Sequence, residues 1–111
     1  MAMNEIERVV DATIRRLRQE GLIRGGDDAE YRRGGDILRR FYRGGVMPEG
    51  ITPENVARAI STQSADRYYE IIPLYYGDGA TVEHLAEYFD CDTTTVARNK
   101  RRLVLAVSQL I

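Results

Sequence analysis

The sequence predicts an all-α protein of four to six helices with a C-terminal helix-turn-helix. Apolar residues recur at spacings of three and four through most of the chain, which is the period of an amphipathic helix. Residues that favour the start of a helix, namely Thr52, Thr81 and Asp92, come directly before three of these stretches. The last two stretches are separated by a turn of about four residues, which is typical of a helix-turn-helix.

The helix-turn-helix pattern occupies residues 80–110, where Thr81 opens the first helix and Asp92 opens the second. Asp90 lies in the turn, and Asp tolerates a left-handed backbone better than most residues. Cys91 is apolar enough to fill the turn, and the small Ala86 suits a close helix crossing. The expected apolar positions are Val82, Leu85, Ala86 and Phe89 in the first helix, and Val96, Leu103, Val107 and Leu110 in the second.

The outward face of the second helix carries the candidate DNA-binding residues. The first turns of such a helix reach base edges in the major groove, where Arg binds guanine with two bonds and Thr contacts the thymine methyl. We predict that Arg98 and the threonines read bases while the neighbouring basic residues hold phosphates. The predicted site is Thr93, Thr94, Ala97, Arg98, Lys100, Arg101 and Arg102. The alternative is a charged face that is only solvated.

The distribution of charge favours nucleic-acid binding more than the net charge of −1 does. Residues 1–43 contain ten basic and eight acidic side chains, and residues 44–92 contain two basic and nine acidic ones. Residues 93–111 contain four basic side chains and no acidic one. An acidic middle beside a basic tail gives a polar molecule with one face that is favourable for phosphates.

The composition argues against several other classes of protein. A hydrophobic content of 43% and a charged content of 30% suit a folded, well-solvated chain. No apolar stretch is long enough for a membrane span, and the start lacks a signal-peptide pattern. One cysteine and one histidine cannot form a familiar zinc site, and a single cysteine makes a reducing cytoplasm the default. We find no catalytic constellation, so we expect neither an enzyme nor a cofactor.

A chain of 111 residues suits one domain with at most a small appendage. We expect an N-terminal helical segment over residues 1–47 and a helix-turn-helix domain over residues 52–111. In the first segment, one helix opens at Asn4 and ends near Gly21, and Gly25–Asp28 is a loop. A second helix covers residues 28–43, where the pair Gly34-Gly35 indicates a kink or a break.

The stretch before the helix-turn-helix contains a strong helix start at Thr52, which is followed by Pro and Glu. Another helix is expected from Ser64 or Asp66, with a bend or break near Ile72 because Pro73 cannot donate a backbone hydrogen bond. Four tyrosines in this region could stack on bases, but core packing with hydroxyls at the rim is the preferred interpretation. They are Tyr68, Tyr69, Tyr75 and Tyr76.

Residues 68–107 resemble the helix-turn-helix of sigma-70 region 4 and, more closely, the small phage-encoded regulators of the RinA and ArpU type. The most specific part is LAEYFDCDTTTVARNKRRL, in which Thr93, Thr94, Arg98 and Arg101 match the recognition-helix face of that family. The stretch VVDATIRRLRQEGLI resembles the leading part of such prophage proteins. The chain departs from the pattern at Gly34-Gly35, at Pro73 and in the short segment 41–52. The resemblance implies a role in activating phage late or packaging genes.

The expected function is therefore sequence-directed binding of double-stranded DNA in transcription control, with RNA polymerase as a further candidate partner. The alternative is a protein-interaction adaptor whose basic last helix docks on RNA polymerase or another regulator without touching DNA. The oligomeric state is also open. Apolar residues that include Val104, Leu105, Leu110 and Ile111 could pair two chains in a homodimer, or the first helix could cover them in a monomer.

Overall fold

The computed structural model describes residues 25–111, and this part of the chain is all-helical, as predicted. Its elements are α2 (Gly25–Arg43), α3 (Pro53–Ser61), the π-helix η1 (Pro73–Gly77), α4 (Val82–Tyr88) and α5 (Thr93–Gln109). The helix predicted from Asn4 lies outside the described residues. None of the helices in the described range is long and apolar enough to cross a membrane.

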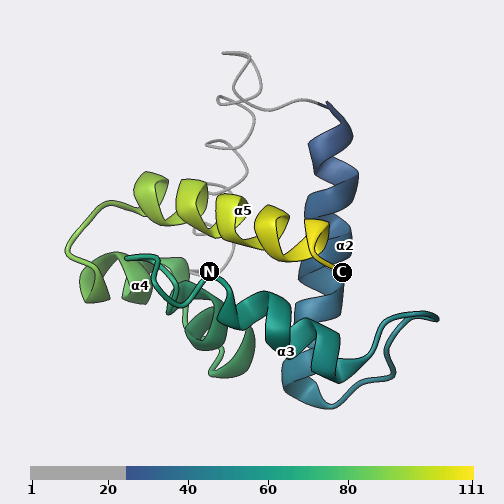
Figure 1. Ribbon diagram of the computed structural model, residues 1–111. Coiled ribbons are helices and arrows are strands. Elements are labelled where there is room, and N and C mark those ends of the chain that lie inside the picture. The colour runs from purple at the N-terminus through teal and green to yellow at the C-terminus, as the bar shows by residue number, and fades with distance from the viewer. Residues whose placement is uncertain (1–24) are drawn as a thin grey trace, which may run out of the picture.

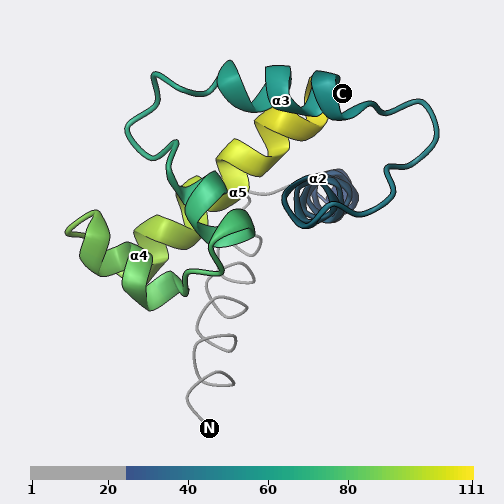
Figure 2. The ribbon, with the colours of Figure 1, turned by 90° about the horizontal axis from the view of Figure 1, so that it is seen from below.

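Helix α5 is the axis of the described fold (Figure 1). It contacts α4 near its own start and α3 near its end, while α2 crosses its second half steeply. When the molecule is turned by 90°, α2 is seen end-on beside α5 (Figure 2). One helix therefore holds three others in place.

A single hydrophobic core fills the space between these helices. The helix-turn-helix contributes Leu85, Ala86, Val96 and Leu103 to it, as predicted, and Phe89 packs against it half-buried. The other helices supply further buried residues, which are Ile37 and Leu38 from α2, Val56, Ala59 and Ile60 from α3, and Tyr76 from η1. The two segments predicted on either side of residues 48–51 thus share one core.

Helix α2 runs unbroken through Gly34 and Gly35, so the predicted break does not occur. The prediction of a loop over Gly25–Asp28 is also wrong, because α2 begins at Gly25. The first turn of α2 contains Asp27 and Asp28, whose carboxylates interact favourably with the positive end of the helix dipole.

Gly34 lies where α2 and α5 approach each other closely. A Cβ atom at this position would lie 2.8 Å from Val104 Cγ1 and 2.9 Å from the Val104 carbonyl oxygen. Those distances are shorter than van der Waals contact, so any side chain would push the two helices apart. The glycine is therefore required by the crossing.

Residues 62–70 form a run of turns, so the helix predicted from Ser64 or Asp66 is wrong. The backbone bonds join residues three apart, as in the 3.1 Å bond from the Tyr69 N–H to the Asp66 carbonyl. The Asp66 side chain accepts a further bond of 2.8 Å from the Tyr68 N–H. Asp side chains compete with the helix in this way because they bond nearby backbone groups.

The interruption predicted near Ile72 takes the form of the π-helix η1, which begins at Pro73. Proline has no N–H to donate. The turn that follows is closed by a π-type hydrogen bond between residues five apart, from the Asp78 N–H to the Pro73 carbonyl at 3.1 Å. The wider turn directs Tyr76 into the core, where it is 3% exposed. The preference for core packing over base stacking is confirmed for this tyrosine.

The helix caps predicted at Thr52, Thr81 and Asp92 are present. The Oγ1 atoms of Thr52 and Thr81 accept bonds of 3.2 and 3.1 Å from the third N–H of the following helix, and Asp92 Oδ1 accepts one of 2.7 Å from Thr95. These bonds satisfy amides that have no partner within the helix. They set the starts of α3, α4 and α5.

We predict opposite effects for alanine at the two adjacent glycines of α2. Gly34→Ala should lower the free energy of unfolding by about 1–3 kcal/mol, because the methyl group would overlap Val104. Gly35→Ala should be neutral or stabilise by up to about 1 kcal/mol, since its nearest contact is the Tyr76 hydroxyl at 3.4 Å and Ala favours a helix. Urea unfolding followed by circular dichroism measures both. Equal losses in the two variants would contradict the close crossing.

Candidate nucleic-acid interface

Helices α4 and α5 form the predicted helix-turn-helix. Asp90 occupies the turn with φ of 53°, which is the one positive φ outside glycine in residues 25–111. The Cys91 N–H then donates to the Ala86 carbonyl at 2.9 Å, and the half-buried Cys91 packs against the core. The turn therefore holds the start of α5 firmly against α4.

The start of α5 presents three of the predicted contact residues. Thr93 and Thr94 are half-buried, and Arg98 is exposed. Arg98 has no hydrogen-bond or ion-pair partner among the described residues, so its guanidinium group is available to a ligand. Hydrogen bonds from Thr95 hold the pKa of Asp92 below its usual range. The carboxylate that caps α5 is therefore ionised, next to the predicted contact residues.

Ala97 and Arg101 do not face outward as predicted, because they are only 3% and 4% exposed. Arg101 Nη2 donates to Asp28 Oδ1 at 2.6 Å, and its guanidinium carbon lies 4.8 Å from the centre of the Tyr31 ring. Both of these partners belong to α2, which crosses this side of α5. A cation that is buried and paired inside the fold is not available to DNA.

Lys100 is also buried, at 6% exposure, and lies among tyrosine rings. Its Nζ is 3.9 Å from the centre of the Tyr75 ring, 5.7 Å from that of Tyr31 and 5.9 Å from that of Tyr76. The negative faces of these rings attract the ammonium group. Burial lowers the pKa of Lys100, since its charged form loses contact with water. Lys100 thus joins α5 to α2 and η1.

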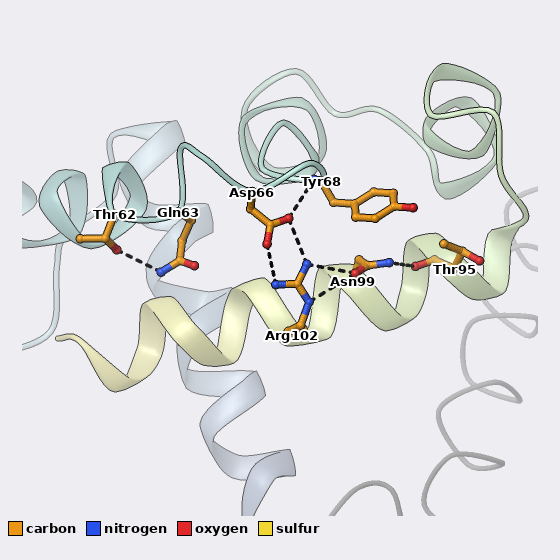
Figure 3. A network of polar contacts seen from close by, with 7 residues as sticks. All are labelled: Thr62, Gln63, Asp66, Tyr68, Thr95, Asn99 and Arg102. Carbon is orange, nitrogen blue, oxygen red and sulfur yellow. Dashed lines mark hydrogen bonds and ion pairs between the residues drawn. The ribbon is translucent and has the colours of Figure 1, made fainter.

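Arg102 is half-exposed, but its guanidinium group is bound by other residues of the protein (Figure 3). Its two terminal nitrogens donate to the Asp66 carboxylate at 2.7 and 3.0 Å, and Nη2 also donates to Asn99 Oδ1 at 3.0 Å. Asn99 in turn donates to the Thr95 carbonyl at 2.8 Å. This network fastens the turns of residues 62–70 to α5.

The predicted site therefore divides into two groups. Thr93, Thr94 and Arg98 remain together at the accessible start of α5, while Ala97, Lys100, Arg101 and Arg102 take part in packing or in internal ion pairs. The carboxylates that pair with Arg101 and Arg102 belong to Asp28 and Asp66, which lie 73 and 36 residues away in the sequence. No local spacing pattern could reveal such partners, although the acidic surplus of residues 44–92 is consistent with Asp66 as one of them.

Exposed carboxylates lie close to the helix-turn-helix. Glu83 and Glu87 are on the solvent side of α4, and Asp90 and Asp92 flank the turn. Negative charge near the start of α5 repels phosphates, so only a close cation can offset it. Arg98 is the exposed cation on this part of α5.

No protein-family model, curated protein or solved structure matches the chain. Within the described residues, no group of His, Cys, Asp and Glu side chains is arranged to hold a metal ion. The candidate interface therefore depends on the geometry of α4 and α5.

We predict that the Asp66–Arg102 pair adds stability that is lost in acid. Asp66→Asn should reduce the stability by up to about 1 kcal/mol at neutral pH, a modest value because Arg102 is half-exposed. The hydrogen bonds from Arg102 lower the pKa of Asp66 from 3.8, so the contribution is complete above 3.8 and disappears as the pH falls through the lowered pKa. Urea unfolding at neutral pH and at about pH 2 should show the difference closing. A difference that is independent of pH would contradict the role of the ion pair.

We predict that the charge of Lys100 is dispensable for folding, whereas its volume is not. Lys100→Met keeps the chain length and should be neutral or stabilising, because replacing a buried cation by an apolar group of similar size removes its desolvation penalty. Lys100→Ala should destabilise by about 2 kcal/mol or more, since it leaves a cavity among the tyrosines. Thermal unfolding compares the two variants. A large loss of stability in Lys100→Met would show that the charge itself is required.

Proposed function

We propose that the chain is a sequence-directed DNA-binding protein that acts in transcription control and contacts DNA through the first two turns of α5. The helix-turn-helix geometry carries this proposal. The turn at Asp90 and the cap at Asp92 place Thr93, Thr94 and Arg98 together at the accessible end of one helix. A helix end of this kind fits the major groove, which is about 12 Å wide, and its first residues reach base edges.

Each of these residues has a distinct role in the proposed complex. Arg98 reads a guanine through its O6 and N7 atoms, and the threonines supply methyl and hydroxyl contacts to neighbouring bases. Lys100, Arg101 and Arg102 have no part in it, because groups inside the chain already hold them. Base contact therefore depends mainly on Arg98.

The biological setting in this proposal comes from the resemblance to RinA- and ArpU-type regulators. It is a cytoplasmic phage or prophage regulator of late genes that acts with RNA polymerase. Burial supports a monomer over a homodimer, since Val104 and Val107 are fully covered within the chain. At 55% exposure, Leu110 is the one large hydrophobic side chain of α5 and its cap that is strongly exposed.

One observation supports a second candidate function, that of a protein-interaction adaptor that does not touch DNA. Three of the four basic residues of α5 are engaged inside the chain, while Glu83 and Glu87 lie exposed on α4. A surface of this kind suits a basic partner that docks on α4, in place of a partner that docks on the basic last helix. The two functions differ in whether the chain binds DNA at all.

We predict that Arg98→Gln removes sequence preference. A preferred duplex is first selected from a random pool with the unaltered chain. The variant should bind this duplex about 1–3 kcal/mol more weakly, because Gln cannot reproduce the two bonds of Arg to guanine. Its affinity for random duplexes should fall by a smaller factor, since only the charge of Arg98 is lost there. Fluorescence anisotropy at fixed salt measures both affinities.

Arg58→Gln is the matched control, since Arg58 is an exposed residue of α3 with no side-chain partner among the described residues. It should leave the preference intact. If Arg98→Gln retained the full preference, the assignment of the reading helix would be wrong. If the unaltered chain bound no duplex, the adaptor function would stand in place of DNA binding.

A further inference from the structure

The solvent side of α2 carries more exposed positive charge than any other described helix. Its exposed charged residues are Arg32, Arg33, Asp36, Arg39, Arg40 and Arg43. Their spacing of three and four places them along one side of the helix. The opposite side carries Ile37 and Leu38, which are buried in the core.

Two of these five arginines have tasks within the fold. Arg33 donates to the carbonyls of Ser108 and Ile111, each at 2.9 Å, and so fastens α2 to the end of α5. Arg40 pairs with Asp36 at 3.1 Å and donates to the Val46 carbonyl at 2.8 Å. The single acid on the exposed face is therefore already neutralised.

The other three arginines, Arg32, Arg39 and Arg43, form an arginine line with no acidic partner among the described residues. Arg32 and Arg43 make no side-chain hydrogen bond or ion pair there, and Arg39 lies 5.7 Å from the centre of the Tyr76 ring. At 1.5 Å per residue, the line extends for about 16 Å along α2. Asp36 lies on the same side, but Arg40 offsets its charge.

The residue type in this line matches the chemistry of phosphates. Lys100 is the single lysine of the chain, and it is buried, so every exposed cation of the described part is an arginine or the chain's one histidine. A guanidinium group binds a phosphate through two parallel bonds, which an ammonium cannot do. The close crossing at Gly34 and the Arg101–Asp28 pair hold α2 in place, so the backbone that carries the line needs no further ordering.

We propose that the arginine line binds the phosphate backbone of a DNA duplex. This inference rests on the proposed function, and it assigns to α2 the phosphate contacts that the sequence alone places on Lys100, Arg101 and Arg102. Each strand carries one phosphate for about every 3.4 Å of the duplex axis, so a line of about 16 Å lies within reach of several of them. A lipid surface fits less well, because an interfacial helix exposes an apolar face and that of α2 is in the core.

The test is the salt dependence of DNA binding in Arg32→Gln, Arg43→Gln and the double variant. Each substitution should make the slope of log K against log salt less negative by about one unit, and the double variant by about two. The affinities for the selected duplex and for random duplexes should fall by the same factor, because backbone contacts carry no sequence information. Arg58→Gln is again the control and should leave the slope unchanged.

The outcomes separate this inference from the proposed function. If the unaltered chain binds DNA and the double variant keeps the same salt slope, the arginine line is overturned and the role of Arg98 is left intact. An acidic protein partner for α2 would give that same result. A loss confined to the selected duplex also overturns it. An unaltered chain that binds no DNA overturns both proposals.

Arg43 lies in the last turn of α2, where its charge stabilises the helix dipole, so the melting temperature of each variant is measured as well. If the double variant is unfolded, Arg32→Gln alone must still reduce the slope.

Discussion

The rest of the described structure depends on the crossing of α2 over α5 at Gly34. The missing side chain lets the α2 backbone approach Val104 directly. At this separation Asp28 pairs with Arg101, and Tyr31 of α2 lies beside Lys100. If the helices moved apart, Arg101 would stay partly buried while losing Asp28, and an uncompensated buried charge is strongly destabilising. Helix packing and ion pairing are therefore coupled at one position.

The same crossing determines which charges reach solvent. The sequence places four basic residues in the last 19 positions, but Lys100 and Arg101 are buried and Arg102 is held by Asp66. What looks like a basic recognition helix is, from its second turn onward, the packing partner of α2 and of the turns before η1. Most of the exposed positive charge on the described helices lies instead on α2, whose glycine pair makes it look like a weak helix in the sequence.

Local features of the fold could be predicted, because they depend on neighbouring residues. The caps at Thr81 and Asp92, the left-handed turn at Asp90 and the apolar positions of the helix-turn-helix all follow from short-range chemistry. The helix expected after Ser64 was wrong, since side-chain bonding by Asp66 and the missing N–H of Pro73 outweigh the apolar spacing. Of the predicted site residues, only Thr93, Thr94 and Arg98 stay accessible without an internal ion pair, because periodicity identifies the face that a helix turns outward but not which distant helix covers it.

The arrangement of charge explains why Arg98 and the face of α2 would have to act together. The exposed carboxylates of α4 and its turn lie near the start of α5. Helix α2, which carries the exposed arginines, crosses the second half of α5 (Figure 1). A polyanion is repelled by the carboxylates near the start of α5 and attracted by the arginines of α2. The electrostatic field of the protein would therefore orient it before contact. In the proposed complex, entry of the α5 start into a groove would bring Glu83 and Glu87 toward phosphates, a repulsion that one guanidinium group would offset only in part. Contacts of the α2 arginines with the DNA backbone would then supply the remaining attraction without a basic recognition helix.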